Sequence, residues 1–244
     1  MKPIGITEIH DLKNAIQYFQ DCYLVSSIGA LTNSTNGRQI LKENIAHINN
    51  GYRIKFRNFN GQNKDFFISK KEMDDLVYMD KYLNPVPIDA KYPHNPIIKA
   101  IEVAMNKIIH LDPSKKPWIC RIAKCNERFE FNKPSIFLEM FTGKKPITIN
   151  EGNLRLNLKS KEKESRELLN QISKSQNNSF VLGTAFGFYK KLNNTHCYSL
   201  MSADKDSHIT ELFDHRRQKT IKLTFDEIIN HIKFIVGYFD KDLI

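Results

Sequence analysis

One cysteine and one histidine of this 244-residue chain stand where a thiol could become a nucleophile. Cys22 lies where a polar stretch gives way to an almost unbroken apolar run, typical of a buried helix that continues to Leu31. A helix start offers unpaired backbone N–H groups and the positive end of the helix dipole, which favour thiolate over thiol. His196 heads a strand-like run far downstream. An imidazole next to that thiol would complete a nucleophile and base pair.

Each of the two residues also has an ordinary structural interpretation. A free cysteine most often serves as a small buried hydrophobe, and a histidine before a strand is more often a hydrogen-bonded partner than a catalyst. A functional interpretation therefore depends on several segments agreeing in one order along the chain.

Composition indicates an ordinary globular protein, with 41% hydrophobic residues. The formal net charge of +10 raises the question of nucleic acid. However, the densest basic stretches, Lys64–Lys71 and Lys159–Arg166, alternate with acidic residues, as solvated faces do. Nucleic acid is therefore not favoured as the main partner, while a negatively charged substrate or an anionic membrane surface stays open.

The four cysteines, which are Cys22, Cys120, Cys125 and Cys197, give neither a disulfide framework nor a zinc pattern. We expect reduced thiols and no cofactor. No apolar run approaches the length of a membrane span, and the N-terminus lacks the apolar stretch of a signal peptide. The expected location is the cytoplasm, or outside the cell after export without a classical signal peptide.

Helices dominate the expected first half of the chain. Asp11 is expected to cap a helix over residues 12–19, ahead of the Cys22 helix. Alternating apolar and basic residues from Tyr52 to Arg57, a turn, and a returning Phe66–Ile68 predict a hairpin. Further helices are expected over residues 38–48, 97–109 and 135–141.

The second half changes to short β-prone runs after a helix over residues 161–172. These runs are Phe180–Phe186, His196–Ser202, Ile209–Phe213 and Thr220–Phe225. A capping box at Thr224 predicts a closing helix that continues through Val236. The expected fold class is α+β, with a mainly helical lobe over residues 1–145 carrying the cysteine. A mainly antiparallel β lobe over residues 146–244 would carry the histidine, with a cleft between the lobes.

Several segments resemble the protease core of the calpain family, a papain-like group of cysteine peptidases. Residues Asp21–Leu31 resemble the family's Gly-Asp-Cys-Trp-Leu-Leu-Ala-Ala-Ile-Ala-Ser-Leu, and Thr195–Met201 resemble Gly-His-Ala-Tyr-Ser-Val. Weaker matches are Ile98–Ile109 to Leu-Leu-Glu-Lys-Ala-Tyr-Ala-Lys-Leu, Leu138–Gly143 to Ala-Leu-x-Asp-Phe-Thr-Gly-Gly, and Lys222–Ile228 to the strand-to-helix end of the core. The five matches follow the family's order and span most of the chain.

The resemblance implies a papain-like cysteine peptidase fold in which Cys22 is the nucleophile and His196 its base. The family places an orienting asparagine in Asn-Pro-Trp, where this chain reads Leu212–Arg217. Asp214 is the expected third residue, and His215 is the alternative. Asp214 also has a purely structural interpretation, as a turn residue at the end of a strand. The family's shielding tryptophan is missing from this segment.

The resemblance also implies an oxyanion hole made by the Cys22 backbone N–H and a glutamine side chain upstream. Gln17 is the expected donor if the connecting loop is one residue shorter than in the family, and Gln20 is the alternative. The chain has no acidic loop of EF-hand type, so we expect activity that does not need calcium.

The sequence therefore predicts a calpain-like cysteine endopeptidase that cleaves a protein or peptide through an acyl-enzyme intermediate. A microbial effector is the expected biological setting. Two alternatives stay open: a catalytically inactive calpain-like binding module, and a Cys-His acyltransferase or amidase acting on a protein side chain. Cys197 follows the histidine directly, and strand alternation predicts that it points to the opposite face, away from the chemistry.

Overall fold

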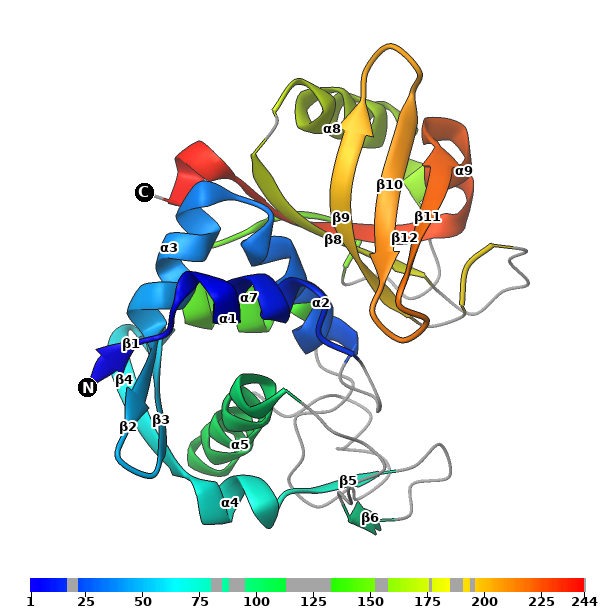
Figure 1. Cartoon of the computed structure of the whole chain (residues 1–244). Coiled ribbons are helices and arrows are strands. Elements are labelled where there is room, and N and C mark those ends of the chain that lie inside the picture. Colours follow the sequence, from blue (N-terminus) through cyan, green and yellow to red (C-terminus); the bar gives the residue numbers. More distant parts are fainter. Residues whose placement is uncertain are drawn as a thin grey trace.

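The computed structural model describes residues 1–16, 22–79, 85–87, 95–112, 133–151, 158–175, 177–184, 191–193 and 196–243. Within these ranges the chain combines helices with antiparallel β-sheets (Figure 1), so the predicted α+β class is confirmed at that level. No described helix has the length and apolar character needed to cross a membrane.

Helices and a small sheet make up the first half. The helices are α1 (Ile6–Lys13), α2 (Cys22–Thr32), α3 (Thr35–Asn44), α4 (Lys70–Asp74), α5 (Pro96–Leu111) and α7 (Pro134–Thr142). Strands β1 (Lys2–Pro3), β2 (Ile45–Ile48), β3 (Gly51–Phe59) and β4 (Gln62–Ser69) pair in chain order, and β5 (Val77–Met79) pairs with β6 (Pro85–Pro87).

The predicted hairpin is confirmed as β3 and β4. The side chains of Tyr52, Ile54 and Phe56 are buried while their neighbours are more exposed, as the alternation predicts. The Phe56 ring packs edge-on against Phe137 and Phe141 of α7. The hairpin thus covers a helix of the same half.

A six-stranded antiparallel sheet dominates the second half, in the order β11-β10-β9-β8-β12-β7. Its strands are β7 (Ile147–Ile149), β8 (Asn178–Thr184), β9 (Cys197–Asp204), β10 (Ile209–Asp214), β11 (Lys219–Thr224) and β12 (Ile232–Phe239). The helical segments are η2 (Leu158–Lys161), α8 (Glu162–Lys174), α9 (Phe225–His231) and η3 (Asp240–Leu243). The expected division at residue 145 falls between α7 and β7.

The predicted closing helix is only partly correct. The capping box is confirmed, since the Glu227 backbone N–H donates to Thr224 Oγ1 at 3.2 Å. However, the helix ends at His231, and residues 232–239 form β12 between β8 and β7. β-branched and aromatic residues suit a buried central strand, and a Cβ on Gly237 would lie 2.1 Å from the Ser179 carbonyl oxygen.

Two helix boundaries near the N-terminus were also wrong. α1 begins after Gly5, whose N–H donates to the Glu8 carboxylate, so Asp11 lies inside this helix and does not cap it. The helix expected over residues 38–48 begins earlier and ends at Asn44, because residues 45–48 pair with β3 as strand β2. Strand pairing here prevails over helical periodicity.

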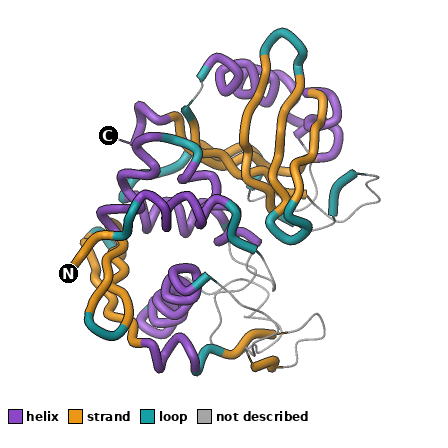
Figure 2. Tube along the Cα trace, in the orientation of Figure 1, coloured by secondary structure: helices purple, strands orange, loops and turns teal. Residues whose placement is uncertain are grey.

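The six-stranded sheet packs against helices on both faces (Figures 1 and 2). One face contributes Val181, Cys197, Val236 and Tyr238 to a core that it shares with α2 and the rest of the first half. The other face packs Phe180, Leu182, Tyr198 and Leu200 with apolar residues of α8 and α9. Helix α2 is therefore wrapped on all sides, and its residues 23–32 are all buried, as its sequence predicts.

Candidate active site

Cys22 is the first residue of α2, as the sequence predicts. It is partly exposed, whereas the residues that follow it in the helix are buried. The first N–H groups of a helix have no partner within the helix, so the thiol lies at a terminus that favours negative charge.

Hydrogen bonds fix α2 against strand β9. Ser26, one turn after Cys22, donates from Oγ to the Cys197 carbonyl oxygen at 2.9 Å. The Ser199 hydroxyl in turn lies 2.8 Å from the Ser26 carbonyl oxygen. A Cβ on Gly29 would lie 2.6 Å from Ser199 Oγ, so only glycine permits this close approach. The start of α2 is thereby brought to the start of β9.

His196 is placed immediately before β9 and held by its own backbone. Its N–H donates to Thr184 Oγ1 at 3.0 Å, and its carbonyl oxygen accepts from the Thr184 N–H at 2.9 Å. His196 is 4% exposed, and its imidazole packs edge-on against the Tyr198 ring, with 4.7 Å between ring centroids. The ring therefore has a fixed position.

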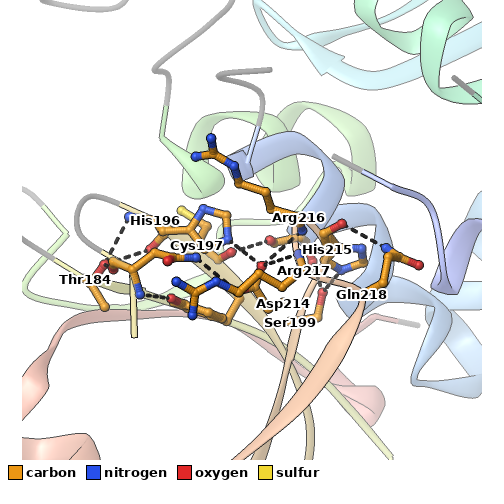
Figure 3. A network of polar contacts seen from close by, with 12 residues as sticks. Thr184, His196, Cys197, Ser199, Asp214, His215, Arg216, Arg217 and Gln218 are labelled. Atoms are coloured by element: carbon orange, nitrogen blue, oxygen red, sulfur yellow. Dashed lines mark hydrogen bonds and ion pairs between the residues drawn. The ribbon is translucent and has the colours of Figure 1, made fainter. Parts of the chain in front are cut away.

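Asp214 lies at the end of β10 and meets His196 across the sheet (Figure 3). Its Oδ1 is 3.1 Å from His196 Nε2 and also accepts the backbone N–H groups of Arg216 and Arg217 at 3.0 and 3.1 Å. Its Oδ2 accepts the Asn193 side-chain N–H at 3.0 Å. Asp214 is thus both a partner of the imidazole and a strand-end turn residue, the two interpretations that the sequence left open.

The Cys22 thiol interacts with the side chains of His196 and Cys197. Because Asp214 occupies Nε2 of His196, the nitrogen left to face the thiol is Nδ1. A hydrogen bond from Cys197 holds the pKa of Cys22 well below its usual range; burial opposes this, and His196 adds to it. Burial alone would lower the pKa of His196, but Asp214 and Cys22 raise it to about 9. These shifts favour a thiolate and imidazolium pair.

The predicted orientation of Cys197 on its strand was correct, but the prediction that its thiol lies away from the chemistry was wrong. Residues alternate along β9 as expected, and Cys197 and Ser199 point to the face opposite Tyr198. That face, however, is the one that packs against α2. Its thiol therefore contacts Cys22, and this contact raises the pKa of Cys197 well above its usual value.

His215, the alternative third residue, makes no hydrogen bond to His196 among the described interactions. Its Nδ1 is 2.9 Å from the Ala15 carbonyl oxygen, and its Nε2 is 2.7 Å from Ser199 Oγ. Burial lowers its pKa to about 4, so it is a neutral ring that joins the end of the α1 segment to β9.

One functional detail escapes the sequence. Asn193 fixes the second carboxylate oxygen of Asp214, and only its place shortly before His196 could have suggested this. Gln17, the predicted oxyanion donor, and its alternative Gln20 lie outside the described residues. Among the described residues, no group of three His, Cys, Asp or Glu side chains is arranged to hold a metal ion.

Neither a protein-family model nor a curated protein sequence matches this chain. The calpain-like resemblance therefore depends on the segments quoted above, and the case for function depends on the geometry of Cys22, His196 and Asp214.

Proposed function

We propose that this protein is a cysteine peptidase with a papain-like arrangement, in which Cys22, His196 and Asp214 form the catalytic triad. The observation that carries the proposal is that one imidazole lies between a thiol at a helix start and a fully buried carboxylate. Such a third group holds the ring in the orientation and tautomer that the nucleophile needs.

The reaction follows from these contacts. The Cys22 thiolate attacks the carbonyl carbon of a substrate amide, and His196 gives its proton to the leaving amine. Water then attacks the resulting thioester, with His196 accepting its proton, and releases the acid and the free thiol. Asp214 orients the ring throughout and stabilises the imidazolium in the steps where the ring carries the proton.

The oxyanion that forms in each step needs donors aimed at it. The backbone N–H of Cys22 begins α2 and can supply one donor. We assign the second to the side chain of Gln17, as the calpain-like resemblance implies. A protein or peptide amide is the proposed substrate.

The arrangement of elements supports a papain-like fold. A central helix that begins with the cysteine packs across one face of an antiparallel sheet, and that sheet supplies the histidine and the carboxylate from two adjacent strands. The two strand ends and the helix start thus meet at one place.

Labelling with a thiol-reactive peptide epoxide tests the proposal. With limiting reagent on the native protein, we expect rapid modification of Cys22 alone, mapped by mass spectrometry, and its loss in His196→Ala. His47→Ala is the matched control, because His47 lies on the first-half sheet and contacts Glu8. This variant should label as the wild type does.

Slow labelling that is the same in all three proteins would contradict the proposal and favour a binding module that retains the fold. If labelling behaves as expected, a peptide mixture analysed by mass spectrometry identifies the reaction. Cleavage gives two fragments for each substrate, whereas acyl transfer or side-chain amide hydrolysis does not.

A further inference from the structure

The triad leaves one group at the site without a role, the thiol of Cys197. This residue is 7% exposed, and its side chain contacts that of Cys22. A peptidase of this design needs one thiol, and a second thiol in contact with the first has chemistry of its own.

A direct contact and a hydrogen bond nearby place the two thiols together, and the packing of Cys22 agrees with them. Their side chains interact directly. The Ser26 hydroxyl, one turn along α2 from Cys22, donates to the Cys197 carbonyl oxygen at 2.9 Å and so ties this turn of the helix to this residue. Cys22 also packs against the core cluster to which Cys197 belongs. Both sulfurs are free thiols, so no bond has yet formed between them.

We propose that Cys22 and Cys197 form a redox-active dithiol site, in which a hydroperoxide oxidises Cys22 and Cys197 then closes a reversible disulfide with it. The conclusion that this disulfide would switch peptide hydrolysis off rests on the proposed function. The oxidation itself needs only the contact between the two sulfurs.

The chemistry proceeds in two balanced steps. The Cys22 thiolate attacks one oxygen of the hydroperoxide, the O–O bond breaks, and the products are a Cys22 sulfenic acid and hydroxide or alkoxide. The Cys197 sulfur then attacks the sulfenic sulfur. The S–O bond breaks, a disulfide forms, and the hydroxyl leaves with the Cys197 proton as water. The hydroperoxide is the oxidant, reduced by two electrons.

The environment of each thiol suits its step. Cys22 belongs to the more exposed residue of the two, and its thiol is the one stabilised as a thiolate, so it reacts with the peroxide first. The hydrogen bond with Cys22 raises the pKa of Cys197 and so keeps it a thiol, and burial and the neighbouring Cys22 charge act in the same direction. Oxidation of Cys22 to the neutral sulfenic acid removes that charge, and Cys197 then becomes easier to deprotonate and attack.

The disulfide would have two consequences for the site. It occupies the nucleophile, so peptide hydrolysis stops until a thiol reductant restores Cys22. It also intercepts the sulfenic acid before further peroxide drives it to the irreversible sulfinic acid. Cys197 would thus convert oxidative damage into a reversible off state.

Mass mapping after mild oxidation tests this inference. The native wild-type protein is treated with hydrogen peroxide, free thiols are alkylated, and the non-reduced digest is analysed. We expect a linked peptide joining Cys22 to Cys197, loss of alkylation at both residues, and full recovery with dithiothreitol. In Cys197→Ala and Cys197→Ser we expect Cys22 sulfinic acid that dithiothreitol does not reverse.

The double variant Cys120→Ser/Cys125→Ser is the matched control, and it should form the same linked peptide as the wild type. Cys22 sulfinic acid beside an alkylated Cys197 in the wild type, or Cys22 linked to either of the other two cysteines, would overturn the inference. The readout is mass and not turnover, so its failure is separable from failure of the peptide epoxide labelling.

Discussion

Two buried histidines stand close to Asp214, and the structure gives them opposite character. His196, at the start of β9, has its pKa raised to about 9, whereas burial lowers that of His215, in the turn after β10, to about 4. Exposure does not explain the difference, because the two residues are 4% and 0% exposed.

The partners of the two rings explain it. His196 contacts a carboxylate and a thiol that becomes a thiolate, so its positive form gains two opposite charges. His215 contacts the Ala15 carbonyl oxygen and the Ser199 hydroxyl, which are neutral groups. The positive charge on His196 then lowers the pKa of His215 further.

The comparison shows how one carboxylate divides two neighbouring rings into a proton carrier and a structural link. The ring that accepts and gives protons in the proposed reaction is the one in contact with charge. The ring that remains neutral links Ala15, just after α1, to Ser199 of β9, which in turn binds Ser26 of α2.

The largest expected effect comes from removing the charge that makes His196 different. Asp214→Asn keeps the size of the side chain and removes the carboxylate, so the pKa of His196 should fall from about 9 toward its ordinary value. An amide oxygen can still accept from the ring, as the asparagine of the calpain family does, so the rate at the pH optimum should fall little. The alkaline limb of the pH profile should move to lower pH, and each pH unit beyond it should slow peptide hydrolysis by about 10-fold.

Glu211→Gln is the control for Asp214→Asn, because Glu211 lies on the same strand and pairs with Lys222 at the surface. It removes the same charge and should leave both rate and profile unchanged. An alkaline limb that stays in place in Asp214→Asn would show that Asp214 is only a turn residue.

The second effect concerns stability, and it tests the structural role of His215. His215→Gln leaves the Ala15 carbonyl oxygen and the Ser199 hydroxyl without their ring partner, so we expect a loss of about 1 to 3 kcal/mol in the free energy of unfolding at neutral pH. Urea unfolding measures this loss.

The same variant should change the acid limb of the stability profile. The ring has an ordinary pKa of 6.5 when unfolded and about 4 when folded, so between these values the unfolded state binds more protons. The contribution of this group to wild-type stability therefore falls as pH drops through that window, by up to about 1.4 kcal/mol per pH unit. Unfolding curves of His215→Gln at several pH values should lack this contribution, and an unchanged acid slope would show that His215 is not held neutral.

The sequence predicted the parts of the site that depend on local pattern. The change from polar to apolar residues located the start of α2 at Cys22, which follows from chain periodicity that a single sequence displays. Asp214 was expected because the calpain-like resemblance places the third residue after the β-prone run over residues 209–213, which ends at this carboxylate.

The sequence could not predict the features that depend on how the faces of helices and strands pack against one another. Alternation placed Cys197 correctly on the face opposite Tyr198, but only the fold shows that α2 lies on that face. Likewise, the apolar spacing of residues 232–239 suits a helix or a buried strand, and the position between β8 and β7 decides for the strand. His215 was considered as a triad residue because its place in the chain does not reveal its partners.

The smallest expected effect comes from removing the hydroxyl partner of the neutral His215 ring. Ser199→Ala removes the group that lies 2.7 Å from His215 Nε2 and 2.8 Å from the Ser26 carbonyl oxygen, so unfolding should become easier by about 1 kcal/mol. The acid slope should persist because His215 stays buried, and labelling of Cys22 should stay at the wild-type rate because Ser26 still binds the Cys197 carbonyl oxygen.

A marked loss of labelling in the folded variant would mean that the neutral ring does more than hold elements together. The link through Ser199 would then control how closely α2 brings Cys22 to His196, and the division between the two histidines would not be complete.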